Sequence, residues 1–405
     1  MTHPVHRIAV QSAARQAVAD APTPASPPPL SLYVHYPWCV RKCPYCDFNS
    51  HALRDGHESA ELERRYIDAV IDDLARTAVE VAGRTVDTVF FGGGTPSLMS
   101  PHSLGRVIDA IARHTTLAPD AEITLEANPG TFEAERFRGF RTAGANRLSI
   151  GIQSFDDAHL AALGRIHDSA EAHRAIAIAL QHFERVNLDL MYALPGQDLA
   201  GALTDLHTAL SFGTEHLSCY HLTLEPNTPF FQHPPALPDD DAAADMQEAF
   251  EARLAEAGYE HYETSAFARP DARCRHNLAY WTFADYLGIG AGAHGKLSRP
   301  DGIVREMRHK HPQRYLEAAT TGRFVQESRT VTRDELPFEF MMNALRLTGG
   351  VPAACFETRT GLPLSAIATQ LAEARGAGLL DTDETVLRPT LRDQRFLHEL
   401  LEMYL

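Results

Sequence analysis

Three cysteines in one short segment constrain this chain more than any other feature of its sequence. Cys39, Cys43 and Cys46 have the spacing C-x-x-x-C-x-x-C. Three thiolates can each hold one iron of a cubic [4Fe-4S] cluster, and the fourth iron then has no protein ligand. Electron-transfer clusters are usually held by four cysteines. The spacing therefore predicts a cluster with one open coordination position, and an open position is typical of a site of chemistry, as it is in catalytic zinc sites.

A structural zinc site is the main alternative. Structural zinc has four ligands, usually in two pairs, whereas Cys219, Cys274 and Cys355 are isolated in sequence. His35 or His51 would have to supply the fourth ligand. A disulfide framework is not indicated, because six cysteines in 405 residues do not make a disulfide-rich chain. The ligand types favour iron and sulfur over zinc.

Composition limits the class of protein. A chain of 405 residues with 44% hydrophobic residues can form two or three domains with a sizeable core. The net charge of -16 argues against a nucleic-acid partner, because binding a duplex needs a basic face. No apolar run reaches the roughly 18 residues that a membrane-spanning helix needs. Unpaired cysteines fit a reducing compartment, so we predict a cytoplasmic protein.

The first thirty residues differ from the rest of the chain. Residues 1–30 are rich in alanine and proline and contain no continuous apolar segment of the kind found in secretory signals. Few acidic residues accompany Arg7 and Arg15, as in a transit peptide. The proline-rich end favours a disordered leader instead.

Strand-like and helix-like runs alternate after this leader. The apolar runs predict strands at 32–36, 86–91, 122–126, 147–152, 186–191 and 217–224. Helical spacing occurs at 60–81, 102–114, 133–143, 170–181, 199–210 and 241–257. Repeated strand–helix units predict a parallel sheet. About six units suit a partial (β/α)6 barrel, a relative of the eight-fold barrel, in preference to a doubly wound sheet.

Polar and glycine-rich segments stand where these predicted strands end. The cysteine segment follows the first strand, Gly92-Gly93-Gly94-Thr95-Pro96 the second, Glu126 the third and Gln153 the fourth. Asp189 lies near the end of the fifth strand, and Thr223 at the end of the sixth. Because chemistry in parallel barrels sits at the carboxyl ends of the strands, we expect these groups to share one mouth.

The last part of the chain has a different pattern. Helical runs at 335–347, 352–359 and 363–375, an expected hairpin at 379–387 and a final helix at 391–404 resemble a winged-helix unit. The helix at 364–371 carries no positive charge, which favours packing or partner docking over DNA binding. We therefore predict an α/β protein in four parts: a leader at 1–30, a barrel at 31–265, a barrel extension and connector at 266–329, and a small, mainly helical, winged-helix-like domain at 330–405.

The cysteine spacing, the aromatic Tyr45 before the last cysteine and the glycine run after the second strand resemble the radical S-adenosylmethionine (SAM) superfamily. Glycines let a ligand approach the backbone closely, and this superfamily holds the methionine end of SAM with that segment. The resemblance implies that the open iron chelates SAM and that a reduced cluster cleaves it. By itself the glycine run would indicate only a tight turn.

A narrower resemblance covers residues 31–405. The segments 32–51, 126–130, 151–155, 187–191 and 225–228 resemble the group that contains the oxygen-independent coproporphyrinogen III oxidases. Within this group, His276-Asn277-Leu278-Ala279-Tyr280-Trp281 and the glycine-rich segment 288–295 resemble the HemW family of heme chaperones. The oxidases carry a fourth cysteine two places after the third, where this chain has Phe48. The resemblance therefore implies heme binding and transfer, with oxidative decarboxylation as the alternative and a winged-helix regulator as a third reading.

The resemblance assigns roles residue by residue. It implies that Cys39, Cys43 and Cys46 bind the cluster. The residues implied to bind SAM are Tyr33, Tyr45, Gly93, Gly94, Thr95, Glu126, Gln153, Arg165, Asp189 and Thr223. Without the resemblance, Glu126 and Asp189 would equally suit helix capping or salt bridges, Arg165 a surface cation and Gln153 a loop amide.

A heme ligand is harder to predict. Neutral imidazole suits iron, and among 21 histidines we single out His276, beside the Tyr-Trp pair, and His294, in a glycine-rich segment. A single histidine is more often a hydrogen-bonded structural group, and Cys219 is a weaker candidate. The implied partners are heme and an apo form of a heme-dependent respiratory enzyme. The sequence leaves open a homodimer and a peripheral membrane contact, although no basic amphipathic helix stands out.

Overall fold

A curved, mainly parallel sheet forms the centre of the computed structural model, which describes residues 22–53, 59–130, 134–395 and 397–405. Within these residues the sheet has 12 strands in the order β14-β13-β12-β11-β1-β4-β5-β6-β7-β8-β10-β9. The six predicted barrel strands lie side by side and in parallel: β1 (Leu30–Tyr36), β4 (Thr85–Gly93), β5 (Thr116–Ala127), β6 (Arg147–Gln153), β7 (Arg185–Tyr192) and β8 (His216–His221). The chain thus has the predicted α/β fold with a partial barrel.

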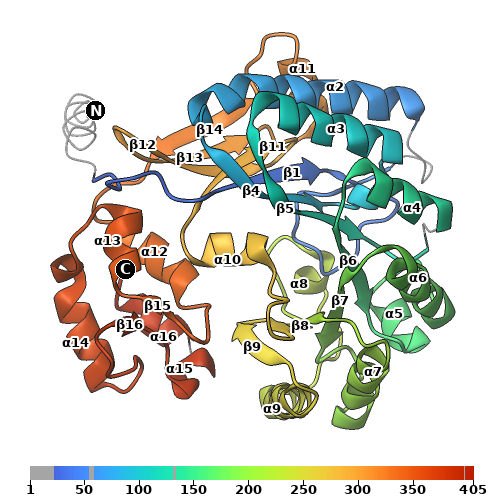
Figure 1. The fold of residues 1–405 in the computed structure, drawn as a ribbon. Coiled ribbons are helices and arrows are strands. Elements are labelled where there is room, and N and C mark those ends of the chain that lie inside the picture. The colour runs from blue at the N-terminus through green and yellow to red at the C-terminus, as the bar shows by residue number, and fades with distance from the viewer. Residues whose placement is uncertain (1–21, 54–58, 131–133, 396) are drawn as a thin grey trace, which may run out of the picture.

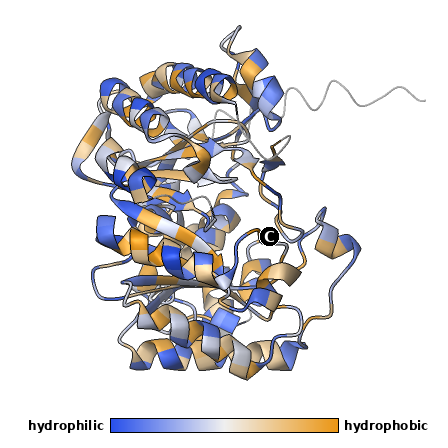
Figure 2. Ribbon diagram, turned by 90° about the vertical axis from the view of Figure 1, so that its right-hand side faces the viewer, coloured by the Kyte–Doolittle hydropathy of each residue, from blue (hydrophilic) through white to orange (hydrophobic). Residues whose placement is uncertain are grey.

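Helices lie along the outside of this sheet (Figure 1). They are α2 (Ala60–Thr77), α3 (Pro101–His114), α4 (Ala134–Ala143), α5 (Asp157–Ala162), α6 (Ser169–His182), α7 (Leu199–Ser211) and α9 (Asp240–Glu256). Side chains cap several of their first turns: Ser59 accepts from Leu62 N, and Asp168 with Glu171 forms a reciprocal capping box. These helices carry both hydrophilic and hydrophobic residues (Figure 2), and their apolar positions pack on the strands.

Two of the central barrel strands, β6 and β1, are almost entirely buried. β6 has buried residues at every position except its last, and β1 at all but one. Continuous burial of this kind is typical of parallel sheets. Because the strands are parallel, their carboxyl ends lie on one side of the sheet. The short elements that follow these ends are β2 (Trp38–Cys39), β3 (His51–Ala52), the 3-10 helix η3 (Pro96–Leu98) and α8 (Pro229–Gln232).

The barrel is extended at both edges. At one edge β10 (Ala266–Ala268) and β9 (Glu260–Glu263) add to β8 in antiparallel pairing. At the other edge β11 (Asp285–Ile289) pairs in parallel with β1, followed by antiparallel β12 (His294–Arg299), β13 (Gly302–Arg308) and β14 (Val325–Thr330), with α11 (Pro312–Ala318) between the last two strands in sequence. Helix α10 (Arg275–Trp281) joins the two edges and lies across the middle of the molecule in Figure 1.

The C-terminal part is mainly helical, as predicted, and has its own hydrophobic core. Its elements are α12 (Leu336–Ala344), β15 (Val351–Pro352), α13 (Ala354–Thr360), η4 (Leu364–Ile367), α14 (Ala368–Gly376), β16 (Val386–Leu387), α15 (Leu391–Arg395) and α16 (Leu397–Glu402). The chain turns back on itself at the expected hairpin, because Leu380 forms an antiparallel bridge with Pro389 and Asp381 N donates to the carbonyl of Arg388. The sequence did not predict that β16, which lies in this turn, also pairs with β15 on the other side of α13 and α14 in sequence. Residue 396 lies outside the described residues, so the single final helix predicted there is described as two.

The leader prediction falls mostly on residues 1–21, which lie outside the described residues. Its last positions, 22–30, belong to the folded structure. Arg84 Nη2 donates to the carbonyl of Pro28, Asp285 N donates to the carbonyl of Pro29, and β1 begins at Leu30. The predicted boundary at residue 30 is therefore too late, because backbone acceptors before it already bond to the sheet.

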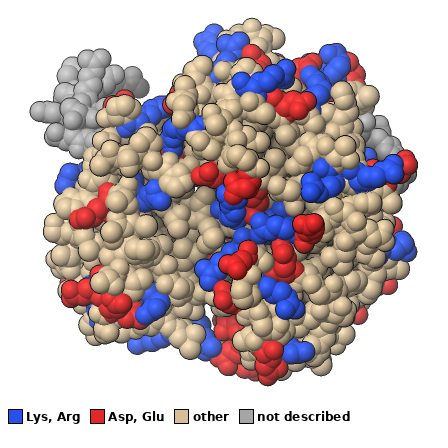
Figure 3. All heavy atoms as spheres, in the orientation of Figure 1, with Lys and Arg blue, Asp and Glu red and all other residues tan. Residues whose placement is uncertain are grey.

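Charges of both signs are interleaved over the face seen in Figure 3, so that face has no continuous basic track. Within the residues that the structure describes, no helix has the length and apolar character needed to cross a membrane.

Candidate functional site

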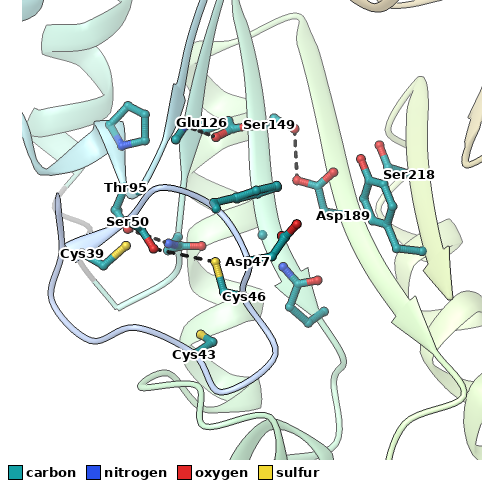
Figure 4. Close-up of a pocket in the computed structure, with 18 of the residues that line it drawn as sticks. Cys39, Cys43, Cys46, Asp47, Ser50, Thr95, Glu126, Ser149, Asp189 and Ser218 are labelled. Atoms are coloured by element: carbon teal, nitrogen blue, oxygen red, sulfur yellow. Dashed lines mark hydrogen bonds between the residues drawn. The ribbon is translucent and has the colours of Figure 1, made fainter. Parts of the chain in front are cut away.

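The three cysteines lie on one loop after β1. Parallel pairing of β2 with β3 closes this loop, and His51 N donates to the carbonyl of Pro37 while Leu53 N donates to that of Cys39. Figure 4 shows Cys39, Cys43 and Cys46 around the bend of the loop, on one side of a cavity. All three thiols are free of disulfides. The sequence spacing thus places three thiols so that they face a common space.

Asn49 fastens this loop to the sheet extension. Its amide nitrogen donates to the carbonyls of Ala291 at 3.0 Å and Lys310 at 2.8 Å, and its own carbonyl lies 2.9 Å from Nε2 of His35. Gly292 has φ +85°, and a Cβ there would lie 2.1 Å from the Asn49 side chain. The backbone of the glycine-rich segment 288–295 can therefore contact the Asn49 side chain of the cysteine loop closely, because Gly292 has no Cβ.

The glycine run after β4 lies against the same loop. Gly94 N donates to the carbonyl of Tyr36 at 2.6 Å, and Thr95 N to that of Trp38 at 2.8 Å. A Cβ on Gly94 would lie 2.5 Å from the carbonyl oxygen of Trp38. Only glycine permits this contact. The glycine run is therefore held directly against the cysteine loop.

A cavity of about 840 Å³ extends from the loop into the barrel, at the upper end of the range for ligand sites. Glu126 and Asp189 face it from β5 and β7 (Figure 4). Burial, with a further contribution from Asp189, raises the pKa of Glu126 to about 8. Burial also raises the pKa of Asp189, against the hydrogen bonds from Asn187 and Ser149. Burial thus favours the neutral form of both carboxyl groups over their charged form, and a neutral carboxyl group can both donate to and accept from a ligand hydroxyl.

Arg165 connects the cavity to the cysteine loop. Its Nη2 donates to Asn128 Oδ1 and to the carbonyl of Gly151, both at 2.7 Å, and its Nη1 lies 3.8 Å from Cys43 Sγ. Burial opposes its charge, but Tyr45 and Cys43 outweigh burial and raise the pKa of Arg165. The guanidinium is therefore charged beside a sulfur that must be a thiolate to bind metal.

Every residue implied to bind SAM lies in the lining of this cavity: Tyr33, Tyr45, Gly93, Gly94, Thr95, Glu126, Gln153, Arg165, Asp189 and Thr223. Gln153 adopts φ +70°, a strained conformation for a residue with a Cβ, at the end of β6. Thr223 Oγ1 donates to Glu225 Oε1 at 2.7 Å. Their individual roles stay predictions.

The two candidate heme ligands have different surroundings. His294 lines the cavity. His276 does not: it is 1% exposed, its Nδ1 lies 2.7 Å from Thr88 Oγ1, and its ring stacks on Phe90 with centroids 5.0 Å apart. Burial lowers the pKa of His276 to about 3. Within the part of the chain that the structure describes, its Nε2 has no hydrogen-bond partner, so a role of His276 as a heme ligand stays a prediction, one that would require the buried ring to become accessible.

The zinc alternative gains no support from the geometry. In the described part of the chain, no three histidine, cysteine or acidic side chains converge as the ligands of a single ion. His35 cannot easily serve, because Nδ1 contacts Tyr33 Oη at 3.0 Å and Nε2 contacts the carbonyl of Asn49. Three soft thiolates that would each take a different iron fit a cluster better. Burial raises the pKa of the Cys39 and Cys46 thiols, so metal binding must drive their deprotonation.

Comparison with known proteins places this site in a family. Residues 33–207 match the model of the radical SAM superfamily, and residues 331–396 match that of the HemN C-terminal domain. "Heme chaperone HemW" of Escherichia coli is 47% identical over 383 residues, which cover 93% of this chain and 98% of that protein. The protein of the same name from Haemophilus influenzae is 46% identical over 380 residues, with the same coverage. The chain belongs to the HemW family of heme chaperones.

A solved structure has the same fold as this chain. Coproporphyrinogen III oxidase (HemN) from Escherichia coli superposes with a TM-score of 0.78 at 24% identity, covering 96% of this chain and 92% of that enzyme. The likeness shows a shared fold. In this HemW-family chain, Phe48, the residue that separates the two families in the sequence resemblance, is 60% exposed and lines the cavity.

Sequence reasoning missed several residues of the HemW-family site. Asn49 anchors the cysteine loop, Asn128 bridges Thr95 and Arg165, and Arg147 and Arg346 line the cavity. Asn49 stands three places after Cys46, and Asn128 stands two places after Glu126 in the strand-end segment Glu-Ala-Asn-Pro. Their positions just after predicted site residues were the one sequence signal that could have indicated them. Arg346 stands in the C-terminal part, and nothing local in sequence links it to the barrel.

Proposed function

We propose that this protein binds heme and delivers it to a heme-dependent respiratory acceptor, and that it carries a [4Fe-4S] cluster and SAM. The observation that carries the proposal is the 47% identity, over nearly the full length of both chains, to a protein named as a heme chaperone. Phe48 in place of the fourth cysteine supports the chaperone over the oxidase.

The cofactors follow from the chemistry of the lining. Cys39, Cys43 and Cys46 supply three thiolates for the cluster, and the backbone of Gly93 and Gly94 offers close approach for the amino-acid end of SAM. When bound, the pair of cofactors would supply one-electron reduction of a sulfonium. The protein's own part is to hold both groups against one cavity wall and to exclude water from it. Unbridged thiols on the cysteine loop suit a reducing compartment, which supports a cytoplasmic location.

A heme titration tests the proposal. Anaerobically reconstituted protein should show a saturable Soret-band shift at one heme per chain. It should then lose that heme to an apo form of a respiratory heme protein. Heme that binds loosely and without saturation, or that stays on the protein, would contradict the chaperone role.

The oxidase alternative has its own assay. The same preparation is incubated with SAM, a reductant and coproporphyrinogen III under anaerobic conditions. We expect no protoporphyrinogen. Its formation in amounts comparable to a true oxidase would overturn the proposal. A homodimer and a peripheral membrane contact stay predictions, and gel filtration and vesicle flotation with and without heme would test them.

A further inference from the structure

The cavity has an aromatic wall that the cluster and SAM residues do not use. We define it as Tyr280 and Trp281 at the end of α10, Tyr286 on β11, and Arg346 after α12, all of which line the cavity. The ring centroids of Tyr280 and Tyr286 lie 4.6 Å apart, and those of Tyr280 and Trp281 lie 6.3 Å apart. The Arg346 guanidinium carbon lies 4.3 Å from the centroid of the Trp281 ring. The wall thus combines flat apolar surface with one cation.

Arg346 reaches the wall from the C-terminal part of the chain. Its backbone is fixed by Thr264, whose N donates to the Arg346 carbonyl at 3.0 Å, and by its own N, which donates to the carbonyl of Asn343. An antiparallel bridge between Glu263 and Leu347 adds to this anchoring. The position of the side chain is therefore set by the joint between the barrel and the C-terminal part.

Two nitrogen donors on this wall lack acceptors. Among the described residues, Nε of Arg346 and Nε1 of Trp281 are buried with no hydrogen-bond partner. Arg346 forms a long ion pair with Glu263, with Nη2 at 3.7 Å from the carboxylate, so a ligand carboxylate would share this cation with Glu263. A buried donor without a partner costs free energy, so such donors are expected to meet an acceptor in the working state of a protein.

Few kinds of ligand could accept hydrogen bonds from both donors. A guanidinium edge favours a planar oxyanion such as a carboxylate. Aromatic rings favour the flat face of a conjugated ring system. Within the described structure Arg165 also has a buried Nε without a partner, but its Nη atoms already contact Asn128, Gly151 and Cys43, on the side of the cavity that holds the cysteine loop.

We propose that Arg346 and the indole N–H of Trp281 bind a carboxylate of a flat aromatic ligand, and that this ligand is heme, held through a propionate. The inference rests on the proposed function, because it takes heme as the cargo. It assigns recognition of the cargo to the joint between barrel and C-terminal part, on the wall away from the cysteine loop.

The test compares the binding of two ligands by the wild type and by Arg346→Gln. Heme and its dimethyl ester, which lacks both carboxylates, are titrated into wild type and Arg346→Gln by Soret absorbance. We expect Arg346→Gln to weaken heme binding by about tenfold to a hundredfold, as for loss of a charge-assisted hydrogen bond, and to leave ester binding unchanged. Repeating the titration with metal-free protoporphyrin IX should give the same loss, since the contact does not involve iron.

Arg273→Gln is a matched control. Arg273 also lies over an aromatic ring, with its guanidinium carbon 5.5 Å from the Tyr262 centroid, and pairs with Glu260 at 3.0 Å, but it is outside the cavity lining. Its substitution should leave both affinities unchanged. Trp281→Phe keeps a ring and removes the N–H, so it should weaken heme binding several-fold and spare the ester. It also serves if Arg346→Gln fails to fold.

The outcomes separate the two claims. If wild type binds neither ligand saturably, the proposed function fails. If wild type binds heme saturably and Arg346→Gln and Trp281→Phe bind it equally well, the function stands and the Arg346 site is overturned. Equal losses for heme and ester would also overturn it, because they would report a packing defect.

Discussion

The backbone amide of Gly93 donates a hydrogen bond to Oε2 of Glu126 at 3.2 Å. This contact joins the glycine run at the end of β4 to the acidic residue at the end of β5, and both line the cavity. It connects a backbone shaped for ligand approach with a carboxyl group whose ionisation is suppressed by burial. The protonation of Glu126 is therefore coupled to the geometry of the glycine run.

The stability of the metal-free protein should depend on Glu126 between about pH 4.5 and 8. The native pKa of about 8 lies above the ordinary value of 4.5. The native state therefore holds a proton that the unfolded chain releases. The stabilising contribution is complete below pH 4.5 and is lost as the pH rises through the native pKa.

Glu126→Gln tests this coupling, since glutamine mimics the neutral acid and can still accept from Gly93. Relative to wild type, the variant should gain stability as the pH rises from 5 to 8, by an amount on the order of a few kcal/mol. Urea unfolding at several pH values measures it. Glu135→Gln, at an exposed surface pair, is the control and should show no such trend. Parallel pH profiles for Glu126→Gln and wild type would disprove the suppressed ionisation.

Cluster assembly should depend on three cysteines and not on the others. Serine at position 39, 43 or 46 removes one soft ligand, so each single variant should lose most of the iron and acid-labile sulfide after anaerobic reconstitution. The electron paramagnetic resonance signal of the reduced cluster should disappear with them. Cys355→Ser, half-buried in α13, should retain the full complement. A full complement in any variant of the loop would require a different ligand.

Prediction from sequence succeeded where local patterns carry the information. Apolar runs located the barrel strands, and the rule that parallel strands end on one side brought Cys39, Glu126 and Asp189 to one cavity. Each of these inferences uses residues close in the chain or a general rule of topology.

It failed where long-range contacts decide. The pairing of β15 with β16 and the bonds of Asn49 to Ala291 and Lys310 join segments that no periodicity links. His276, singled out for its aromatic neighbours, does not line the cavity, because Thr88 on β4 contacts its Nδ1 and the strands bury it. Tertiary packing therefore decides which polar residues face the cavity.

A buried ion pair holds the sheet extension to the barrel helices. Arg308 on β13 and Asp73 on α2 are each 2% exposed at their side chains, and Arg308 Nη2 lies 3.2 Å from Asp73 Oδ1. Tyr315 donates to the same carboxylate at 2.9 Å. Arg308→Met leaves a buried charge without its partner, so it should destabilise the protein by about 3–5 kcal/mol.

Arg64→Met is the comparison, because Arg64 lies on the same helix with 58% of its side chain exposed and pairs with Glu61 and Asp68. Solvent screens exposed pairs, so Arg64→Met should leave the free energy of unfolding nearly unchanged. Urea unfolding of both variants gives the two values. Similar small losses would show that Asp73 keeps enough other donors to remain satisfied.

The fit between Gly94 and the cysteine loop should be intolerant of a single methyl group. A Cβ at position 94 would lie 2.5 Å from the Trp38 carbonyl oxygen, which is backbone and accepts from Thr95 N. Gly94→Ala must therefore push the glycine run away from the loop, at a cost of about 1–3 kcal/mol for overpacking. Because Cys39 follows Trp38 directly, the same shift should lower cluster occupancy.

Gly349→Ala, where a Cβ would have no atom within 4 Å, controls for the general effect of the substitution. The midpoint of thermal unfolding and the iron content should fall for Gly94→Ala and not for Gly349→Ala. An unchanged iron content in Gly94→Ala would show that the loop positions its cysteines independently of the glycine run.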